Sequence, residues 1–332
     1  MTPLIKSSWN CLLMMFLLLT GKRSNAHHQK DLNALKLMVI LFCIFSITCF
    51  ASDSPSRNRT ANSNAEPLIQ DSFNSPENWR RPVTPFQIAD HTWYIGSEGL
   101  SAVLIKTKKG AILIDGGLPG ATKMLLTHMA QLGVSSHDLK WILLSHAHFD
   151  HAGPLAEIHR VTGAQLATNA ETATLLERGG KGDIHFGDLY PFPPAKTDRF
   201  LMDGETIELG GVVLTAHFTP AHTPGTISWT WTDQRENQPI RIAYLDSLTA
   251  PGYKLKDNPR YPHIVEDFRH GFDVMQSISC DLVLTPHPEG SGWTPGKLGS
   301  FLNSPMTCAA YTDHIRERLN KQLQEQKAPG SD

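Results

Sequence analysis

The chain has 332 residues, of which 40% are hydrophobic and 19% are charged, and its formal net charge is −2. The composition is that of an ordinary globular protein. The small net charge gives no electrostatic reason to expect a nucleic acid or a membrane surface as a partner, so we predict neither.

Two apolar stretches stand near the start of the chain, at residues 12–19 and 37–51. Neither reaches the roughly 20 residues that a transmembrane helix needs. The second follows two lysines and ends in small residues before the polar Ser52, which is the layout of a secretory signal peptide. We therefore predict a leader over residues 1–51, with an over-extended gene start, and a mature chain that is exported to the periplasm or secreted and not inserted in the membrane. The alternative is an uncleaved membrane anchor.

Cysteine usage agrees with export. Three of the five cysteines fall in the predicted leader, and only Cys280 and Cys308 remain in the mature chain. An even number of cysteines in an oxidising compartment favours a disulfide. A bridge between the two would close a loop of about 29 residues and contribute roughly 3–4 kcal/mol in the chain-entropy model. The alternative is a pair of unrelated buried thiols.

Composition divides the rest of the chain into three parts. Residues 52–84 are rich in Ser, Asn, Pro and Arg, which predicts a flexible lead-in. Regular apolar patterning begins at Pro85 and predicts a folded domain over residues 85–326. A short tail follows at residues 327–332.

Within this domain, apolar runs bounded by turn residues predict strands. In chain order they cover residues 91–96, 102–105, 111–114, 141–144, 165–168, 206–209, 212–218, 227–232, 240–245 and 282–284. Apolar residues at helical spacing predict helices at residues 121–132, 154–161, 170–177, 261–278 and 307–324. Strands followed by helices occur twice, so we expect two sheets packed face to face with helices on the outer faces.

The segment 179–194 is rich in glycine, proline and aromatic residues. Such a composition indicates either a mobile loop at the rim of a pocket or an ordinary long connection. The residues alone favour neither.

Three histidines and one carboxylate fall within six residues, directly after a predicted strand: His146, His148, Asp150 and His151. Zinc prefers neutral imidazole nitrogen and carboxylate oxygen as ligands. On an extended segment His146 and His148 project to the same side and can reach one metal, whereas the next two residues follow the turn and can face a second. Two cations together lower the pKa of a bridging water toward neutrality. The pattern predicts a dinuclear metal site.

This H-x-H-x-D-H motif resembles the signature of the metallo-β-lactamase superfamily, and the similarity runs from about Pro85 to the last predicted helix. The resemblance implies an α/β fold, the four-layer αββα sandwich of two facing mixed sheets with outer helices, and two zinc ions per chain at one edge of the sheets. It also implies two more ligands, each directly after a strand. These are His222, which begins the sequence H-T-P-G, and His287 in T-P-H-P.

Carried over onto this chain, the family's ligand pattern assigns three residues to each zinc: His146, His148 and His222 to the first, and Asp150, His151 and His287 to the second. Asp115, in the sequence I-D-G-G, resembles the family's residue that holds a ligand in orientation from outside the metal's own shell. The alternative for Asp115 is an ordinary turn aspartate.

The segment 243–253 indicates which subclass of the family's β-lactamases the chain resembles. The commonest β-lactamase subclass has a cysteine ligand here, and this chain has none. Asp246 followed by Ser247 resembles the third subclass, which lacks a cysteine ligand, as do the sequence G-G-K-G-D at 179–183 and the expected bridge between Cys280 and Cys308. In that subclass Ser247 and the hydroxyl of Thr249 meet the substrate carboxylate. Two departures, Ala221 in place of a frequent glycine and Glu289 after the last ligand, leave the ligand set intact.

The resemblance implies a zinc-dependent β-lactamase that hydrolyses the β-lactam amide of penicillins, cephalosporins and carbapenems and gives antibiotic resistance. In the implied mechanism a metal-bound hydroxide attacks the carbonyl, and Asp150 both ligates and orients the nucleophile. We expect a monomer whose partner is a small β-lactam. One alternative is a secreted lactonase or thioesterase of the same fold, with Asp246 bridging both metals. The other is a zinc-binding protein without activity.

Overall fold

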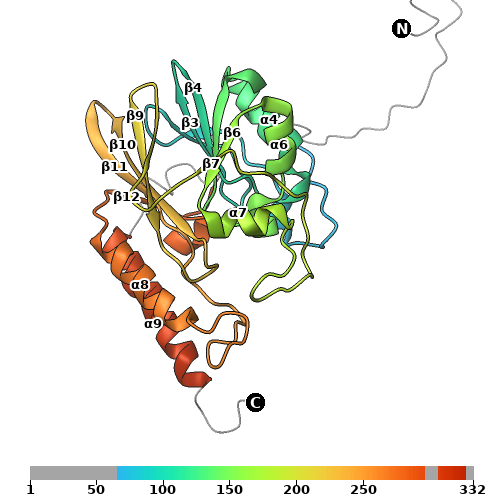
Figure 1. Cartoon of the computed structure of the whole chain (residues 1–332). Coiled ribbons are helices and arrows are strands. Elements are labelled where there is room, and N and C mark those ends of the chain that lie inside the picture. The colour runs from blue at the N-terminus through green and yellow to red at the C-terminus, as the bar shows by residue number, and fades with distance from the viewer. Residues whose placement is uncertain (1–65, 296–305, 327–332) are drawn as a thin grey trace, which may run out of the picture. The chain divides into compact units, whose positions relative to one another are not determined.

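The computed structural model describes residues 66–295 and 306–326 (Figure 1). The predicted leader at 1–51, the first part of the lead-in and the tail at 327–332 lie outside the described residues. Among the helices of the described part, none combines the length and the apolar character needed to cross a membrane.

Seven strands form the first sheet, in which their spatial order is their order in the chain. They are β1 (Phe86–Gln87), β2 (Thr92–Tyr94), β3 (Val103–Thr107), β4 (Gly110–Ile114), β5 (Leu139–Leu143), β6 (Gln165–Thr168) and β7 (Arg199–Phe200). The pairs from β1 to β4 are antiparallel and those from β4 to β7 are parallel, so the sheet is mixed. Leu104 and Leu113 pack on one face, whereas Ile105 and Ile112 pack on the other. The alternation shows that both faces are buried.

Five strands form the second sheet, in the order β12, β11, β10, β9 and β8. Their bounds are β8 (Thr206–Leu209), β9 (Val212–Phe218), β10 (Ile227–Arg235), β11 (Gln238–Tyr244) and β12 (Leu282–Leu284). Only the pair of β11 and β12 is parallel. Trp229 and Tyr244 point toward the first sheet, where they share one core with Ile105 and Ile112, and Ala243 points the other way.

Helices cover the outer face of each sheet and complete four layers (Figure 1). The first sheet carries α4 (Thr122–Gln131) and α6 (Leu155–Thr162), and the second carries α8 (Ile264–Ser277) and α9 (Cys308–Glu325). Shorter helices are α3 (Glu77–Arg80), α5 (Phe149–Ala152) and α7 (Ala170–Glu177), with 3₁₀ turns at Pro119–Ala121, Ser136–Asp138 and Pro288–Ser291. The predicted αββα sandwich is confirmed.

Each predicted strand and helix is present, with ends that differ by a few residues. The strands that the sequence did not predict, β1 and β7, have two residues each, and the unpredicted helices α3 and α5 have four each. A strand that short cannot display an alternating pattern.

The structure differs from the expected flexible lead-in over residues 66–84. Ile69 is 6% exposed and belongs to the core under α4, and Phe73 packs against the same core. Oε2 of Glu66 lies 2.8 Å from Nε2 of His128, a buried residue of α4. Isolated apolar residues in a polar segment therefore anchor it to the domain, although they are too widely spaced to form a pattern.

Candidate metal centre

The predicted ligands gather where strands end. Asp115 follows β4, the segment 145–151 follows β5, and His222 lies on the connection from β9 to β10. His287 follows β12. The parallel pairing of β4 with β5, and of β11 with β12, brings the carboxyl ends of these strands to common edges. Residues from 115 to 287 thus converge on one place.

His146, His148 and His222 form a tight group of buried imidazoles whose candidate ligand atoms lie within 4.8 Å of one another. Their ring centroids are 4.6, 4.7 and 4.8 Å apart, and the ring planes are steeply inclined to each other. Burial and the neighbouring histidines hold the pKa of His146 and of His222 well below the usual value. Both rings are therefore neutral and keep a free lone pair, as metal binding requires.

The partners of the three rings decide which nitrogen is free. Nδ1 of His222 lies 2.8 Å from the carbonyl oxygen of Thr249, which can only accept, so Nδ1 carries the proton and Nε2 the lone pair. Nδ1 of His146 lies 2.8 Å from Oδ1 of Asp246, and its buried Nε2 has no hydrogen-bond partner. These two rings present Nε2 to the space between them.

In His148 the two ring nitrogens have the opposite roles. Its Nε2 lies 3.1 Å from Oδ2 of Asp183, so Nδ1 carries the lone pair. Burial disfavours the charge on Asp183, but His148 and the backbone amides of His185 and Phe186 outweigh it and lower the pKa of Asp183 strongly. Sequence reasoning did not assign a role to Asp183 or to the Thr249 carbonyl.

The second predicted group forms a triangle. Nε2 of His151 lies 3.3 Å from Nε2 of His287, and each of them lies 3.4 Å from Oδ2 of Asp150. Burial opposes ionisation of Asp150, but the charges and hydrogen bonds of His151 and His287 prevail and hold the pKa of Asp150 well below its usual value. Asp150 is therefore an ionised carboxylate.

The donor set and its spacing fit a tetrahedral divalent cation. Zinc bonds of about 2.0–2.1 Å give neighbouring ligands in a tetrahedron a separation of about 3.3–3.4 Å. The triangle of Asp150, His151 and His287 has these edges. Imidazole and carboxylate donors suit zinc among the common cations, and the unpartnered Nε2 of His146 is a buried polar atom that a metal would satisfy.

Asp115 lies behind the centre and not at its surface. Its Oδ1 accepts from the backbone amide of Ser145, and its Oδ2 accepts from the hydroxyls of Ser145 and Tyr244, each at 2.7 Å. Nδ1 of His151 is 3.6 Å from Oδ2. Asp115 therefore fixes the start of the ligand segment directly and affects His151 through its charge. Burial raises the pKa of Asp115 despite these contacts.

The loop 179–194 lies at the centre. The ring of Phe186 is 5.1 Å from that of His148, and Tyr190 stacks on Phe149 at 4.7 Å. Trp79 of α3 lies 6.5 Å from Phe149 and 5.1 Å from His287, measured between ring centroids. Aromatic rings thus border the two groups of candidate ligands.

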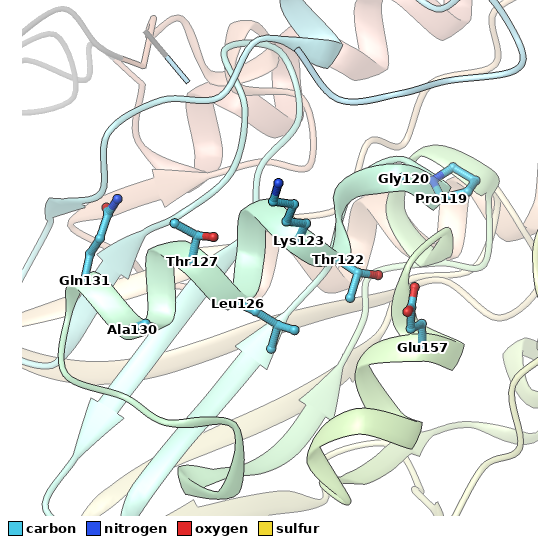
Figure 2. Close-up of a pocket in the computed structure, with 9 residues that line it drawn as sticks. All are labelled: Pro119, Gly120, Thr122, Lys123, Leu126, Thr127, Ala130, Gln131 and Glu157. Atoms are coloured by element: carbon cyan, nitrogen blue, oxygen red, sulfur yellow. The ribbon is translucent and has the colours of Figure 1, made fainter. Parts of the chain in front are cut away.

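Ser247 is 8% exposed and Thr249 is half-buried, directly after Asp246. The predicted cysteine pair lies at the base of α9, where the sulfur atoms of Cys280 and Cys308 are 2.00 Å apart, the separation of a disulfide. A surface hollow elsewhere, along α4, is lined by residues that include Lys123, Leu126 and Glu157 (Figure 2). It contains none of the predicted ligands.

Comparison with known proteins agrees with this geometry. The family model of the metallo-β-lactamase superfamily matches residues 97–235. A metallo-β-lactamase of Cronobacter sakazakii with a HARLDQ motif is 37% identical, with a TM-score of 0.70, and the match covers 75% of this chain and 98% of that one. The chain belongs to the metallo-β-lactamase superfamily, as the sequence predicts.

Two further solved structures indicate the subclass of metallo-β-lactamase that this chain is similar to. The native FEZ-1 metallo-β-lactamase of Legionella gormanii is 33% identical, with a TM-score of 0.68, over 74% of this chain and 98% of that one. BJP-1, a subclass B3 metallo-β-lactamase of Bradyrhizobium japonicum, is 33% identical, with a TM-score of 0.67, over 75% and 97%. This is the subclass that the sequence resembles. Where the Cronobacter motif reads HARLDQ, residues 146–151 here read HAHFDH.

Curated relatives match over shorter stretches. A probable metallo-hydrolase of Burkholderia pseudomallei is 27% identical over 39% of this chain, and a hydroxyacylglutathione hydrolase of Anaeromyxobacter dehalogenans is 32% identical over 36%. The chain spans 44% and 38% of the length of these two relatives. Both names describe a hydrolase; the first names a metal but no substrate, and the second names hydroxyacylglutathione as its substrate.

Proposed function

We propose that this protein is an exported β-lactamase that uses two zinc ions, held by the two groups of residues described above. The proposal is supported by the subclass B3 likeness and by six predicted ligands that converge at one edge of the two sheets. Its substrate would be a small β-lactam. Penicillins, cephalosporins and carbapenems share the strained amide on which such a centre acts.

The observation that carries the proposal over its rival is the orientation of Asp246. A thioesterase or lactonase of this fold needs that carboxylate as a bridge between both metals. Here Oδ1 of Asp246 lies 2.8 Å from Nδ1 of His146, on the side of the ring away from its free Nε2. Neither cluster of potential ligands in the described part of the chain includes Asp246. The contact of Oδ1 with His146 supports a role for Asp246 in orienting a ligand, and its Oδ2 is buried without a hydrogen-bond partner.

Zinc in these groups would act as a Lewis acid that polarises a carbonyl and lowers the pKa of water. The chain's own residues do the rest. Asp150 is ionised and can accept a hydrogen bond from the attacking water, which orients it. Ser247 and Thr249, on the segment next to Asp246, would hold the substrate carboxylate. Phe186 and Trp79 would exclude water from the rim.

The decisive experiment measures hydrolysis of a carbapenem and a cephalosporin by the chain from Ser52 onward, with and without a chelator. We expect turnover that chelation abolishes and added zinc restores. Asp150→Ala should lower kcat by about 10²- to 10⁴-fold, whereas Ser247→Ala should chiefly raise KM. No turnover in a zinc-replete sample would refute the β-lactamase proposal.

A thioesterase is the second candidate, because of the 32% identity to hydroxyacylglutathione hydrolases. The same preparations should therefore be offered an acylglutathione thioester and a lactone. Preferred turnover of either would replace the β-lactam as substrate. Asp246→Ala would then be expected to remove both metals.

Export and resistance have their own tests. We expect the chain expressed in a bacterium to appear in the periplasm or medium with Ser52 as its first residue. The same cells should tolerate more β-lactam than cells that express Asp150→Ala. A full-length chain retained in the membrane would favour the anchor instead.

A further inference from the structure

The C-terminal helix contacts the segment 246–255 through three polar side chains on one face. The hydroxyl of Tyr311 donates to the carbonyl of Asp246 at 3.3 Å. Nε2 of Gln322 donates to the carbonyls of Ala250 at 2.6 Å and Tyr253 at 3.3 Å. Eleven residues make just over three turns of a helix at about 3.6 residues per turn, so Tyr311 and Gln322 lie on the same side of α9.

Gln326 extends this line of contacts by one turn. Its Nε2 donates to the carbonyl of Tyr253 at 2.7 Å, and its Oε1 accepts from the amide of Leu255 at 2.9 Å. The Gln326 carboxamide therefore donates one hydrogen bond to the main chain and accepts one from it, as a residue of a neighbouring β-strand would. Together Gln322 and Gln326 bind the backbone of residues 250–255 at both ends.

The other side of the same segment holds a predicted metal ligand. The carbonyl of Thr249 accepts from Nδ1 of His222 at 2.8 Å, and the hydroxyl of Tyr253 donates to the carbonyl of His222 at 3.0 Å. The ring of Tyr253 also stacks on that of His222, with centroids 5.6 Å apart. The ring and the backbone of His222 are thus both fixed by a loop and not by a strand.

Packing and hydrogen bonds both join α9 to this loop, because Tyr253 and Leu255 are buried in one core with Leu319 of α9. A surface cleft runs between them, lined on one side by Pro251 and Gly252 and on the other by Arg318 and Lys321. Gly252 has a φ of +74°, a conformation that glycine adopts without strain. The buried side chains fix the loop from inside, whereas Gln322 and Gln326 make the hydrogen bonds that join the main chain of residues 250–255 to α9 and its C-terminal end.

We propose that Gln322 and Gln326 are positioning residues for the tri-histidine group. They hold the main chain of residues 250–255, which carries Tyr253 and continues directly from the Thr249 carbonyl, and these two groups set the direction and the tautomer of His222. The inference rests on the zinc site of the proposed function, but it does not depend on which substrate that site hydrolyses. Removal of either carboxamide should let His222 adopt several orientations, and so should weaken the first zinc and leave the second.

The test compares Gln322→Met and Gln326→Met with Gln324→Met in the mature chain. Methionine keeps the length and helix propensity of glutamine but removes its hydrogen bonds. Gln324 is an exposed glutamine on the same helix and serves as the matched control. Zinc affinity is measured by competition with a chromophoric chelator, with no β-lactam present. We expect one of two zinc steps to weaken about tenfold in the first two variants, and neither step to change in the control.

Amide hydrogen exchange gives a second readout on the zinc-free chain. Exchange at residues 250–255 should become faster in Gln322→Met and Gln326→Met, while that of the β-strands stays as in the control. Unchanged zinc affinity, or an equal loss in all three variants, would overturn the proposal. If Gln322→Met does not fold, Gln326→Met tests it alone. Absence of β-lactam hydrolysis in the parent chain would refute the proposed function and leave these measurements valid.

Discussion

Oδ1 of Asp246 lies 2.8 Å from Nδ1 of His146, a residue 100 positions earlier in the chain, and both side chains are buried. The pair joins the end of β11 in the second sheet to the end of β5 in the first. A carboxylate in this position fixes the tautomer of a histidine and makes its other nitrogen a better donor.

Asp246→Asn should therefore weaken zinc binding without abolishing it. The asparagine oxygen can still accept from Nδ1 of His146, but the negative charge that makes Nε2 more basic is gone. We expect a loss of about tenfold in affinity for one zinc, measured by chelator competition. Simultaneous loss of both zinc ions would indicate a bridging ligand and would contradict the assignment.

Asp183→Asn should act on the same three-histidine group through His148. The amide loses the charge that faces Nε2 of His148, although it can still accept from the amides of His185 and Phe186. We expect about tenfold weaker zinc binding and a lower kcat. Asp188→Asn is the matched control, since Asp188 lies on the same loop and accepts only from the amide of Gly182 among the contacts found for it. Equal effects of the two substitutions would mean that the loop as a whole, and not the contact to His148, matters.

Ala221 stands directly before His222 with a φ of +153° and no exposed surface. Such a conformation costs a residue with a Cβ of the order of 1–3 kcal/mol, which glycine avoids. Ala221→Gly should therefore be tolerated much better than Ala216→Gly, at an equally buried position within β9. We expect a difference of at least about 1 kcal/mol in the free energy of unfolding between the two variants, from urea titration. If the two variants lose the same stability, the backbone at Ala221 is not strained.

The pair of Arg241 and Asp281 predicts a pH effect outside the metal centre. Two nitrogens of Arg241 contact the carboxylate at 2.6 and 3.0 Å, and these hydrogen bonds lower the pKa of Asp281 to about 2. An unfolded aspartate titrates near 3.9. The stabilisation is therefore complete above about pH 4 and is lost as the pH falls toward 2.

Arg241→Met should remove that dependence. The difference in unfolding free energy between the parent chain and this variant should shrink as the pH falls from 5 to 2, in zinc-free protein. Because both side chains are about half exposed, the difference at pH 5 should stay within about 1 kcal/mol. Arg269→Met, at an exposed arginine of α8, is the control and should show no such trend. A difference that is constant with pH would exclude the pair as its source.

Much of the fold, and which side chains gather at the candidate centre, could be predicted from the sequence, because both leave local patterns. The run from His146 to His151 is dense in donor side chains, and the placement of His222 and His287 after strands matches a known family order. The groups that hydrogen-bond to these histidines and orient them leave no such pattern in the sequence. Asp183 is one aspartate among many until folding places it beside His148, and the Thr249 carbonyl is a backbone atom that every residue has.

The lead-in shows the same limit at the level of packing. Polar residues separate Ile69, Phe73 and Trp79, so the sequence shows no hydrophobic periodicity that would predict their burial. Their contacts with α4, Phe149 and His287 arise only once distant strands are in place. Composition predicted a flexible segment here because it reflects only which residue types are present and not which tertiary contacts they make.

The two candidate zinc groups draw on both halves of the sandwich: His146 to His151 follow a strand of the first sheet, and His222 and His287 follow strands of the second. A zinc ion bound by either group would link the two sheets at their edge as a removable cross-link. Ligands that bind only the folded chain stabilise it by an amount that grows with their free concentration. The free zinc concentration around the protein would then govern its lifetime against proteases as well as its turnover.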